Sequence, residues 1–221
     1  MAVITISRQF GSGGQEIADR VCELLGYRYL DKVLMTQVAA EVGLSGKEVA
    51  EFSEEKRKAR NFLERLLRPG PHDVVRVSMR ARDATGEETL TVKHLDEARC
   101  ARLVRSAIHT AYKRGNVVIV GRGGQAILQE MSDVFHVRVE APMGARILRV
   151  QKQAGVRAEE ARQLAIEHDQ ASAAYLKRLF GIQWDDPALY HITINTGKWE
   201  LRVAAQIIVD LVGRWQAEPM S

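Results

Sequence analysis

The sequence predicts an α/β fold built on a largely parallel sheet, and two observations carry that prediction. Short apolar runs alternate with helical patterns along the whole chain. A glycine-rich turn joins the first apolar run, Ala2 to Ser7, to the first helical stripe, Gln15 to Leu25. Parallel sheets bind ligands at the carboxyl ends of their strands. We therefore expect the functional site at this turn and its neighbours.

The remaining elements follow in the same alternation. Buried strands are expected where continuous apolar runs are short, and helices where apolar residues recur every three or four positions. The expected strands are 27–30, 116–120, 134–139 and 191–195, and the expected helices are 31–41, 45–67, 96–113, 142–154, 158–180 and 199–214. Pro69-Gly70-Pro71 breaks the charged helical stretch before it, and residues 72–92 show the least regular pattern.

We expect a single domain over residues 1–216 with a short tail, 217–221. Within it, residues 32–92 are interpreted as an insertion that covers a substrate. The net charge of +4 suits anionic ligands without choosing among them.

No apolar run is long enough to span a bilayer, and the opening seven residues are too short and uncharged for a signal peptide. Cys22 and Cys100 show no metal-ligand spacing and are interpreted as buried thiols of a cytoplasmic protein.

The turn Gly11-Ser12-Gly13-Gly14 has the composition of a phosphate-binding loop. Its backbone N–H groups can converge on phosphate oxygens, and the helix that follows adds a partial positive charge. The full pattern G-x-x-x-x-G-K-[ST] is absent, because Gly14 occupies the lysine position and Gln15 or Glu16 the hydroxyl position. Two alternatives stay open: a glycine turn without a ligand, and a dinucleotide site, although its third glycine is missing.

A second glycine-rich turn, residues 121–124, follows the run 116–120 and contains Arg122. If both runs are parallel strands, the two turns face the same rim of the sheet. The histidines form no metal or nucleophile pattern. A nucleic-acid-binding module has only the net charge in its favour, because basic and aromatic residues are not interleaved.

These residues resemble the cytidylate kinase-like family. The most specific segment is the opening one, from Ile4 to Ala18. Further similarity lies in Tyr29-Leu30-Asp31-Lys32, in residues 115–123, in the stretch from Asp169 to Arg178, in Gly181 to Pro187, in Tyr190, and in Ile194-Asn195-Thr196. Residues 42–95 carry little of it.

The resemblance implies a nucleoside monophosphate kinase fold for the domain 1–216, with ATP on the glycine loop, Mg²⁺ and an acceptor opposite. The insertion 32–92 would then be a helical acceptor-binding segment, and residues 153–182 a basic helical lid. Gly11, Ser12, Gly13, Gly14 and Gln15 would then hold the donor phosphates. Asp31 would line the acceptor pocket, Arg122 would contact the acceptor phosphate, and Asp169, Lys177 and Arg178 would belong to the lid. The chain departs from well-characterised cytidylate kinases at Gly14, where they have lysine, and at Gly123, where they have aspartate.

The predicted function is ATP-dependent phosphoryl transfer to a nucleoside monophosphate resembling CMP or dCMP, or to a related small acceptor. The alternative is a non-catalytic nucleotide-binding regulatory protein of the same fold, which the missing lysine favours. Phosphoryl transfer requires a cation near the transferred group, so we expect Arg8 to replace the lysine, with Lys177 and Arg178 as second candidates. Mg²⁺ would be held mostly by phosphates and water, and Glu16 either reaches it or favours the helix dipole.

Overall fold

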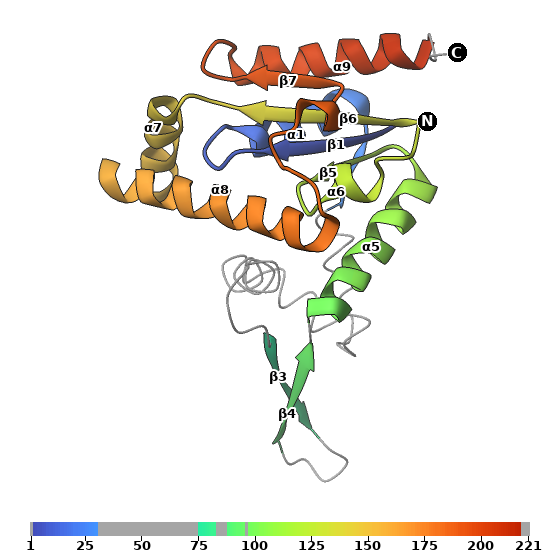
Figure 1. Cartoon of the computed structure of the whole chain (residues 1–221), viewed down its shortest axis with the longest axis vertical. Coiled ribbons are helices and arrows are strands. Elements are labelled where there is room, and N and C mark those ends of the chain that lie inside the picture. Colours follow the sequence, from blue (N-terminus) through green and yellow to red (C-terminus); the bar gives the residue numbers. More distant parts are fainter. Residues whose placement is uncertain (1, 31–74, 83–87, 96, 218–221) are drawn as a thin grey trace. The chain divides into compact units, whose positions relative to one another are not determined.

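A computed structural model of the chain describes residues 2–30, 75–82, 88–95 and 97–217 (Figure 1). The chain divides into two compact units, which are described separately. The first comprises Met1–Val33 and Ile108–Ser221, and the second Leu34–Ala107. The expected helices 31–41 and 45–67, and Asp31 with them, lie outside the described residues.

The first unit contains a five-stranded sheet in the order β2-β5-β1-β6-β7. Its strands are β1 (Val3–Arg8), β2 (Arg28–Tyr29), β5 (Val117–Val120), β6 (Val134–Glu140) and β7 (Ile192–Asn195). Every neighbouring pair is parallel, and Ile6 of β1 is in register with Val120 of β5 and Val137 of β6. The predicted fold class, a parallel sheet flanked by helices, is therefore confirmed. The carboxyl ends of β1, β5 and β6 meet at one edge of the sheet.

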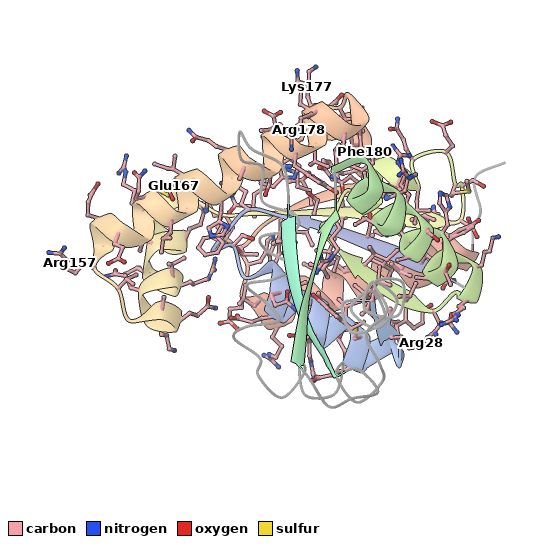
Figure 2. The ribbon with its side chains drawn as sticks, turned by 90° about the horizontal axis from the view of Figure 1, so that it is seen from below. Arg28, Arg157, Glu167, Lys177, Arg178 and Phe180 are labelled. Carbon is pink, nitrogen blue, oxygen red and sulfur yellow. The ribbon has the colours of Figure 1, made fainter. Side chains whose placement is uncertain are left out.

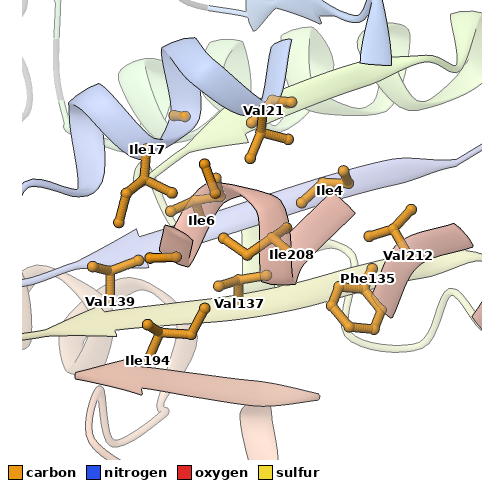
Figure 3. Packing of buried hydrophobic residues seen from close by; sticks show 14 of the residues in the cluster. Ile4, Ile6, Ile17, Val21, Phe135, Val137, Val139, Ile194, Ile208 and Val212 are labelled. Atoms are coloured by element: carbon orange, nitrogen blue, oxygen red, sulfur yellow. The ribbon is translucent and has the colours of Figure 1, made fainter. Parts of the chain in front are cut away.

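The hydrophobic core lies on one face of this sheet (Figure 3). Alternate strand residues such as Ile4, Ile6, Val137 and Val139 point into it, because side chains on a strand alternate between the two faces. Two helices supply the other half of the core: α1 (Gly14–Leu25) through Ile17 and Val21, and α9 (Leu201–Ala217) through Ile208 and Val212.

The opposite face of the sheet is also buried and combines polar side chains with apolar ones such as Ile119 and Val134; we call it the polar face to distinguish it from the core face. Thr5, Ser7, His136 and Arg138 are each 5% exposed or less. The Thr5 hydroxyl lies 2.6 Å from His136 Nδ1, and the Trp184 indole N–H donates to Ser7 Oγ at 2.7 Å. The two hydroxyls and His136 Nδ1 therefore have partners, as buried polar groups require.

The other helices of this unit are α6 (Gly124–Ile127), α7 (Met143–Ala154), α8 (Ala158–Phe180) and the 3₁₀ turn Pro187–Leu189. Figure 1 shows α7 beyond the carboxyl end of β6, with α8 following it. Gly155 and Gly181 adopt left-handed conformations and end α7 and α8. The helix expected over 158–180 is confirmed with the same bounds.

The second unit contains an antiparallel hairpin of β3 (Val75–Arg82) and β4 (Glu88–Leu95). Our expectation of irregular structure over residues 72–92 is wrong for these strands. Val75, Val77 and Met79 alternate with polar residues, which is the period of a half-buried strand. Helix α5 (Glu97–Arg114), whose last residues belong to the first unit, agrees with the helix expected over 96–113.

Within the described part of the chain, no helix is long and apolar enough to cross a membrane. Cys22, on α1, is half-buried against the core, and burial together with the nearby Asp19 and Glu23 carboxylates raises the pKa of its thiol to about 11. The side chain of Cys100 lies outside the described residues.

Candidate functional site: the phosphate loop

The glycine loop connects β1 directly to α1, as predicted. Gly11 and Gly13 have φ angles of +74° and +81°, which L side chains rarely adopt. Gly13 is the N-cap of α1 and offers no capping side chain, and the first helical bond runs from Ile17 N–H to Gly13 O. The N–H groups of Gly14, Gln15 and Glu16 therefore precede the hydrogen-bond ladder and have no partner within the helix. Such a helix end attracts anions.

The carbonyl groups of the loop are held by residues from outside it. Arg146 Nε donates to Phe10 O at 2.7 Å, and Arg149 Nη1 donates to Ser12 O at 3.2 Å. The Thr196 hydroxyl, just after β7, also donates to Ser12 O, at 2.6 Å. Two arginines of α7 and one threonine thus fix the outer side of the loop. The inner side, with its N–H groups, stays oriented for a ligand.

Helix α8 contacts the same loop through Asp169. This carboxylate accepts the N–H of Phe10 at 2.9 Å and forms an ion pair with Arg146. The neighbouring His168 ring stacks on Phe10 with the ring centroids 4.2 Å apart. Asp169, which we expected in the lid region, therefore lies on α8 in direct contact with the phosphate loop.

The second glycine-rich turn lies beside the first, as predicted from parallel strands. Gly121 N–H donates to Ile6 O at 2.9 Å, which joins the end of β5 to β1. Arg122 has φ = +59°, an uncommon conformation for a residue with a side chain. A Cβ on Gly123 would lie 2.6 Å from the Phe180 ring, so this turn also packs against the end of α8. Strain of this kind gathers at functional sites.

The other predicted residues fall in three places. Lys177 and Arg178 are exposed near the carboxyl end of α8, where Figure 2 labels them close to Phe180. The Gln15 amide hydrogen-bonds the Tyr29 hydroxyl at 2.7 Å, and Glu16 accepts from Gln153 at 2.8 Å. Arg8 ends β1, and its side chain lies across Gly14, the residue in the lysine position.

Our sequence analysis missed Arg138, which is 4% exposed on the polar face of the sheet. Its guanidinium forms an ion pair with Glu140, donates to the Trp184 carbonyl, and lies 4.8 Å from the centre of the Trp184 ring. The signal was present, because Arg138 is a charged residue inside a strand that we expected to be buried. Its role is to anchor the segment after α8 to the sheet next to Ser7.

Among the described residues, no group of three or more histidine, cysteine, aspartate or glutamate side chains could hold a metal ion. The uncapped N–H groups at the start of α1 are suited to anions of the phosphate type.

Comparison with known proteins agrees with this geometry. The profile of the cytidylate kinase-like family matches residues 3–198. A cytidylate kinase from Pyrococcus horikoshii is 25% identical over 89% of this chain and 81% of its own length. A cytidylate kinase from Aeropyrum pernix is 24% identical over 93% of this chain and 95% of its own.

Among solved structures, an uncharacterised protein from Eubacterium ventriosum superimposes with a TM-score of 0.63 at 19% identity. The superposition covers 96% of this chain and 99% of that one. This likeness supports the fold.

Proposed function

The chain belongs to the cytidylate kinase-like family, and from this premise we propose that it transfers the terminal phosphoryl group of ATP to a nucleoside monophosphate. The observation that carries the proposal is the phosphate loop itself. Its carbonyls are held outward by Arg146, Arg149 and Thr196, while the first-turn N–H groups of α1 have no helical partner. A preorganised set of N–H donors is what a polyphosphate needs.

The acceptor is proposed to bind next to the second turn. Arg122 follows β5, whose end is bonded to β1, so the acceptor phosphate would approach the donor along the same rim. Arginine is suited to phosphate because its N–H groups form charge-assisted and often bidentate bonds. Asp31 belongs to the same proposal through the family resemblance, with CMP or dCMP as the first acceptors to test, as the names of the relatives suggest.

Mg²⁺ enters this proposal as a partner of the nucleotide. Since the described residues hold no cluster of carboxylates for it, the ion would be bound through phosphate oxygens and water, which is usual for Mg²⁺. It would supply positive charge that partly neutralises the phosphates of the nucleotide. Cytoplasmic localisation is proposed with the same function.

A specific observation favours a second candidate, a non-catalytic nucleotide-binding protein. Gly14 stands where the phosphate loop of kinases carries lysine. Arg146, Arg149 and Thr196 nevertheless hold the carbonyl groups of the loop without that lysine, which supports nucleotide binding. Binding without turnover is then the outcome that distinguishes this candidate.

The test is a screen of acceptors with ADP release as readout. The protein is mixed with ATP, Mg²⁺ and each ribo- and deoxyribonucleoside monophosphate in turn, and ADP is measured by a coupled assay. Transfer to CMP or dCMP above ATP hydrolysis alone supports the kinase. ATP-dependent thermal stabilisation without transfer to any acceptor supports the non-catalytic candidate, and the absence of both would contradict nucleotide binding altogether.

The same assay tests Arg122. Arg122→Ala should raise the KM for the acceptor far more than the KM for ATP. The matched control is Arg202→Ala, which removes an exposed arginine from α9. Equal effects of Arg122→Ala on both KM values would assign Arg122 to the donor or to the fold instead.

A further inference from the structure

The side chain of Arg8 fills a space that two glycines leave open. A Cβ on Gly14 would lie 2.5 Å from Arg8 Cβ and 2.8 Å from Arg8 Cγ. A Cβ on Gly121 would overlap Arg8 Nη1 and lie 3.2 Å from Arg8 Cζ. The aliphatic stem of Arg8 therefore lies on Gly14, and its guanidinium lies against Gly121. We call this space the Gly14–Gly121 slot.

The slot has a counterpart in the sequence pattern. When Gly13 is aligned with the second glycine of G-x-x-x-x-G-K-[ST], Arg8 stands at the first glycine and Gly14 at the lysine. The loop thus carries a cation where the pattern has glycine, and glycine where the pattern has the cation. The two positions touch in space, so the exchange keeps a positive charge on the loop and changes the residue that supplies it.

A side chain at position 8 and a side chain at position 14 do not fit together. A side chain at position 14 would first meet Arg8 Cβ, at 2.5 Å, and the backbone of β1 fixes that atom. A flexible chain end can move aside, but Cβ cannot move without the strand. Any side chain at position 8, arginine included, therefore requires glycine at position 14.

The Arg8 side chain runs from the first turn of the proposed site to the second. Its stem lies on Gly14 of the phosphate loop and its guanidinium against Gly121, and the next residue is Arg122, the proposed contact of the acceptor phosphate. A cation in this place would lie near a phosphoryl group that passes from a donor on the first turn to an acceptor at the second. Lys177 and Arg178, in contrast, are exposed on α8.

We propose that Arg8, seated in the Gly14–Gly121 slot, is the catalytic cation of this phosphate loop; the assignment deepens the proposed kinase function and rests on it. An oxygen of the acceptor phosphate forms a bond to the γ-phosphorus of ATP as the bond from that phosphorus to the bridging oxygen breaks. ADP leaves with the electron pair. The guanidinium stays protonated throughout, donates hydrogen bonds to the transferred group and balances its charge.

The experiment exchanges the two positions. Arg8→Gly should lower kcat by about 10³-fold or more, the effect of losing a transition-state arginine. Gly14→Lys alone should also be inactive, because its side chain collides with Arg8. The double variant Arg8→Gly with Gly14→Lys restores the first glycine and the lysine of the common pattern. Its kcat should be at least about tenfold higher than that of Arg8→Gly. Arg202→Ala serves as the control for loss of a surface arginine.

A binding measurement separates this assignment from the proposed function. Calorimetry gives the Kd for ATP and for ADP without any turnover. A guanidinium beside the third phosphate favours ATP, so Arg8→Gly should reduce the ratio of the two affinities by about tenfold. If the wild type transfers no phosphate, the kinase proposal fails while this ratio still tests Arg8.

Two results would overturn the assignment: an unchanged kcat or affinity ratio in folded Arg8→Gly, and full activity of Gly14→Lys alone. If Arg8→Gly does not fold by circular dichroism, Arg8→Met replaces it. That variant keeps an apolar stem on Gly14 and loses the positive charge against Gly121, so it should fold and still show the reduced kcat and affinity ratio. Wild-type values in Arg8→Met would count against Arg8.

Discussion

Arg146 on α7 and Asp169 on α8 form an ion pair whose two members also hold the backbone of Phe10 from both of its polar groups. Arg146 donates to the Phe10 carbonyl, and Asp169 accepts the Phe10 N–H. The Arg146 side chain is 4% exposed. The phosphate loop, α7 and α8 are thereby joined at one point. Substitutions at this pair should lower both the free energy of unfolding and the affinity for a nucleotide.

Asp169→Asn should destabilise the protein by roughly 3 kcal/mol, because it leaves the buried Arg146 guanidinium without its counter-charge. It should also weaken ATP binding, since Phe10 belongs to the phosphate loop. Denaturant unfolding and calorimetry measure the two effects. Glu167→Gln, an exposed neighbour on α8 (Figure 2), is the control and should change neither. A stability equal to that of Glu167→Gln would show that the pair contributes little.

Trp184→Phe should cost about 1–2 kcal/mol, because Ser7 Oγ loses the indole N–H that donates to it in a buried site. The ring stays large enough to pack against Arg138. Trp199→Phe is the matched control: Trp199 is 51% exposed, and its exchange should lie within about 0.5 kcal/mol of the wild type. Equal unfolding free energies for the two variants would rule out the Ser7 bond as a stabilising contact.

Much of this fold was predictable from local patterns. Strands β1, β5, β6 and β7 are short apolar runs, and Gly155 and Gly181 end helices where the apolar period stops. The phosphate loop was predictable because glycines between a strand and a helix allow positive φ angles and a close approach of backbone N–H groups to phosphate. The position of the two turns at one edge of the sheet was predictable because the strands before them are parallel.

The contacts that hold the site were not predictable in the same way. Arg146, Arg149 and Asp169 are far from Phe10 in sequence, and their hydrogen bonds to loop carbonyls and N–H groups leave no mark in a one-dimensional pattern. In the structure, two arginines of α7 bind carbonyl groups of the loop. The hairpin was missed for another reason. Apolar and polar residues alternate over residues 75–81, which predicts a strand, but the sequence analysis treated this segment as irregular.

Gly13→Ala should destabilise the protein by about 2 kcal/mol or more. Its φ of +81° is unfavourable for any side chain, and the added Cβ would lie 2.6 Å from Leu201 Cδ2. Gly144→Ala is a matched control on α7, since Gly144 has no atom within 4 Å of a built Cβ. That exchange should stabilise the protein by about 0.5–1 kcal/mol. Thermal unfolding distinguishes the two, and a stabilising Gly13→Ala would contradict the loop conformation described.

The pH dependence of stability should depend on His136. Burial on the polar face of the sheet, with a smaller effect of the nearby His191, lowers the pKa of His136 from 6.5 to about 4. Because the unfolded chain binds a proton at this site near pH 6.5 and the folded chain does not, the stabilisation is fully present above pH 6.5. It is lost as the pH falls toward 4, at about 1.4 kcal/mol per pH unit and about 3 kcal/mol in total.

The variant His136→Asn tests this dependence. Its amide oxygen can still accept from the Thr5 hydroxyl, which lies 2.6 Å from His136 Nδ1, but the side chain does not titrate. Urea unfolding at intervals between pH 4 and 8 should give a wild-type curve that falls more steeply below pH 6.5 than the curve of the variant. The free-energy difference between the two proteins should be constant above pH 7. Burial also lowers the pKa of His191, so the variant should keep a shallower slope of the same sign. A difference that stays constant from pH 4 to pH 8 would show that His136 is protonated equally in the folded and unfolded chain.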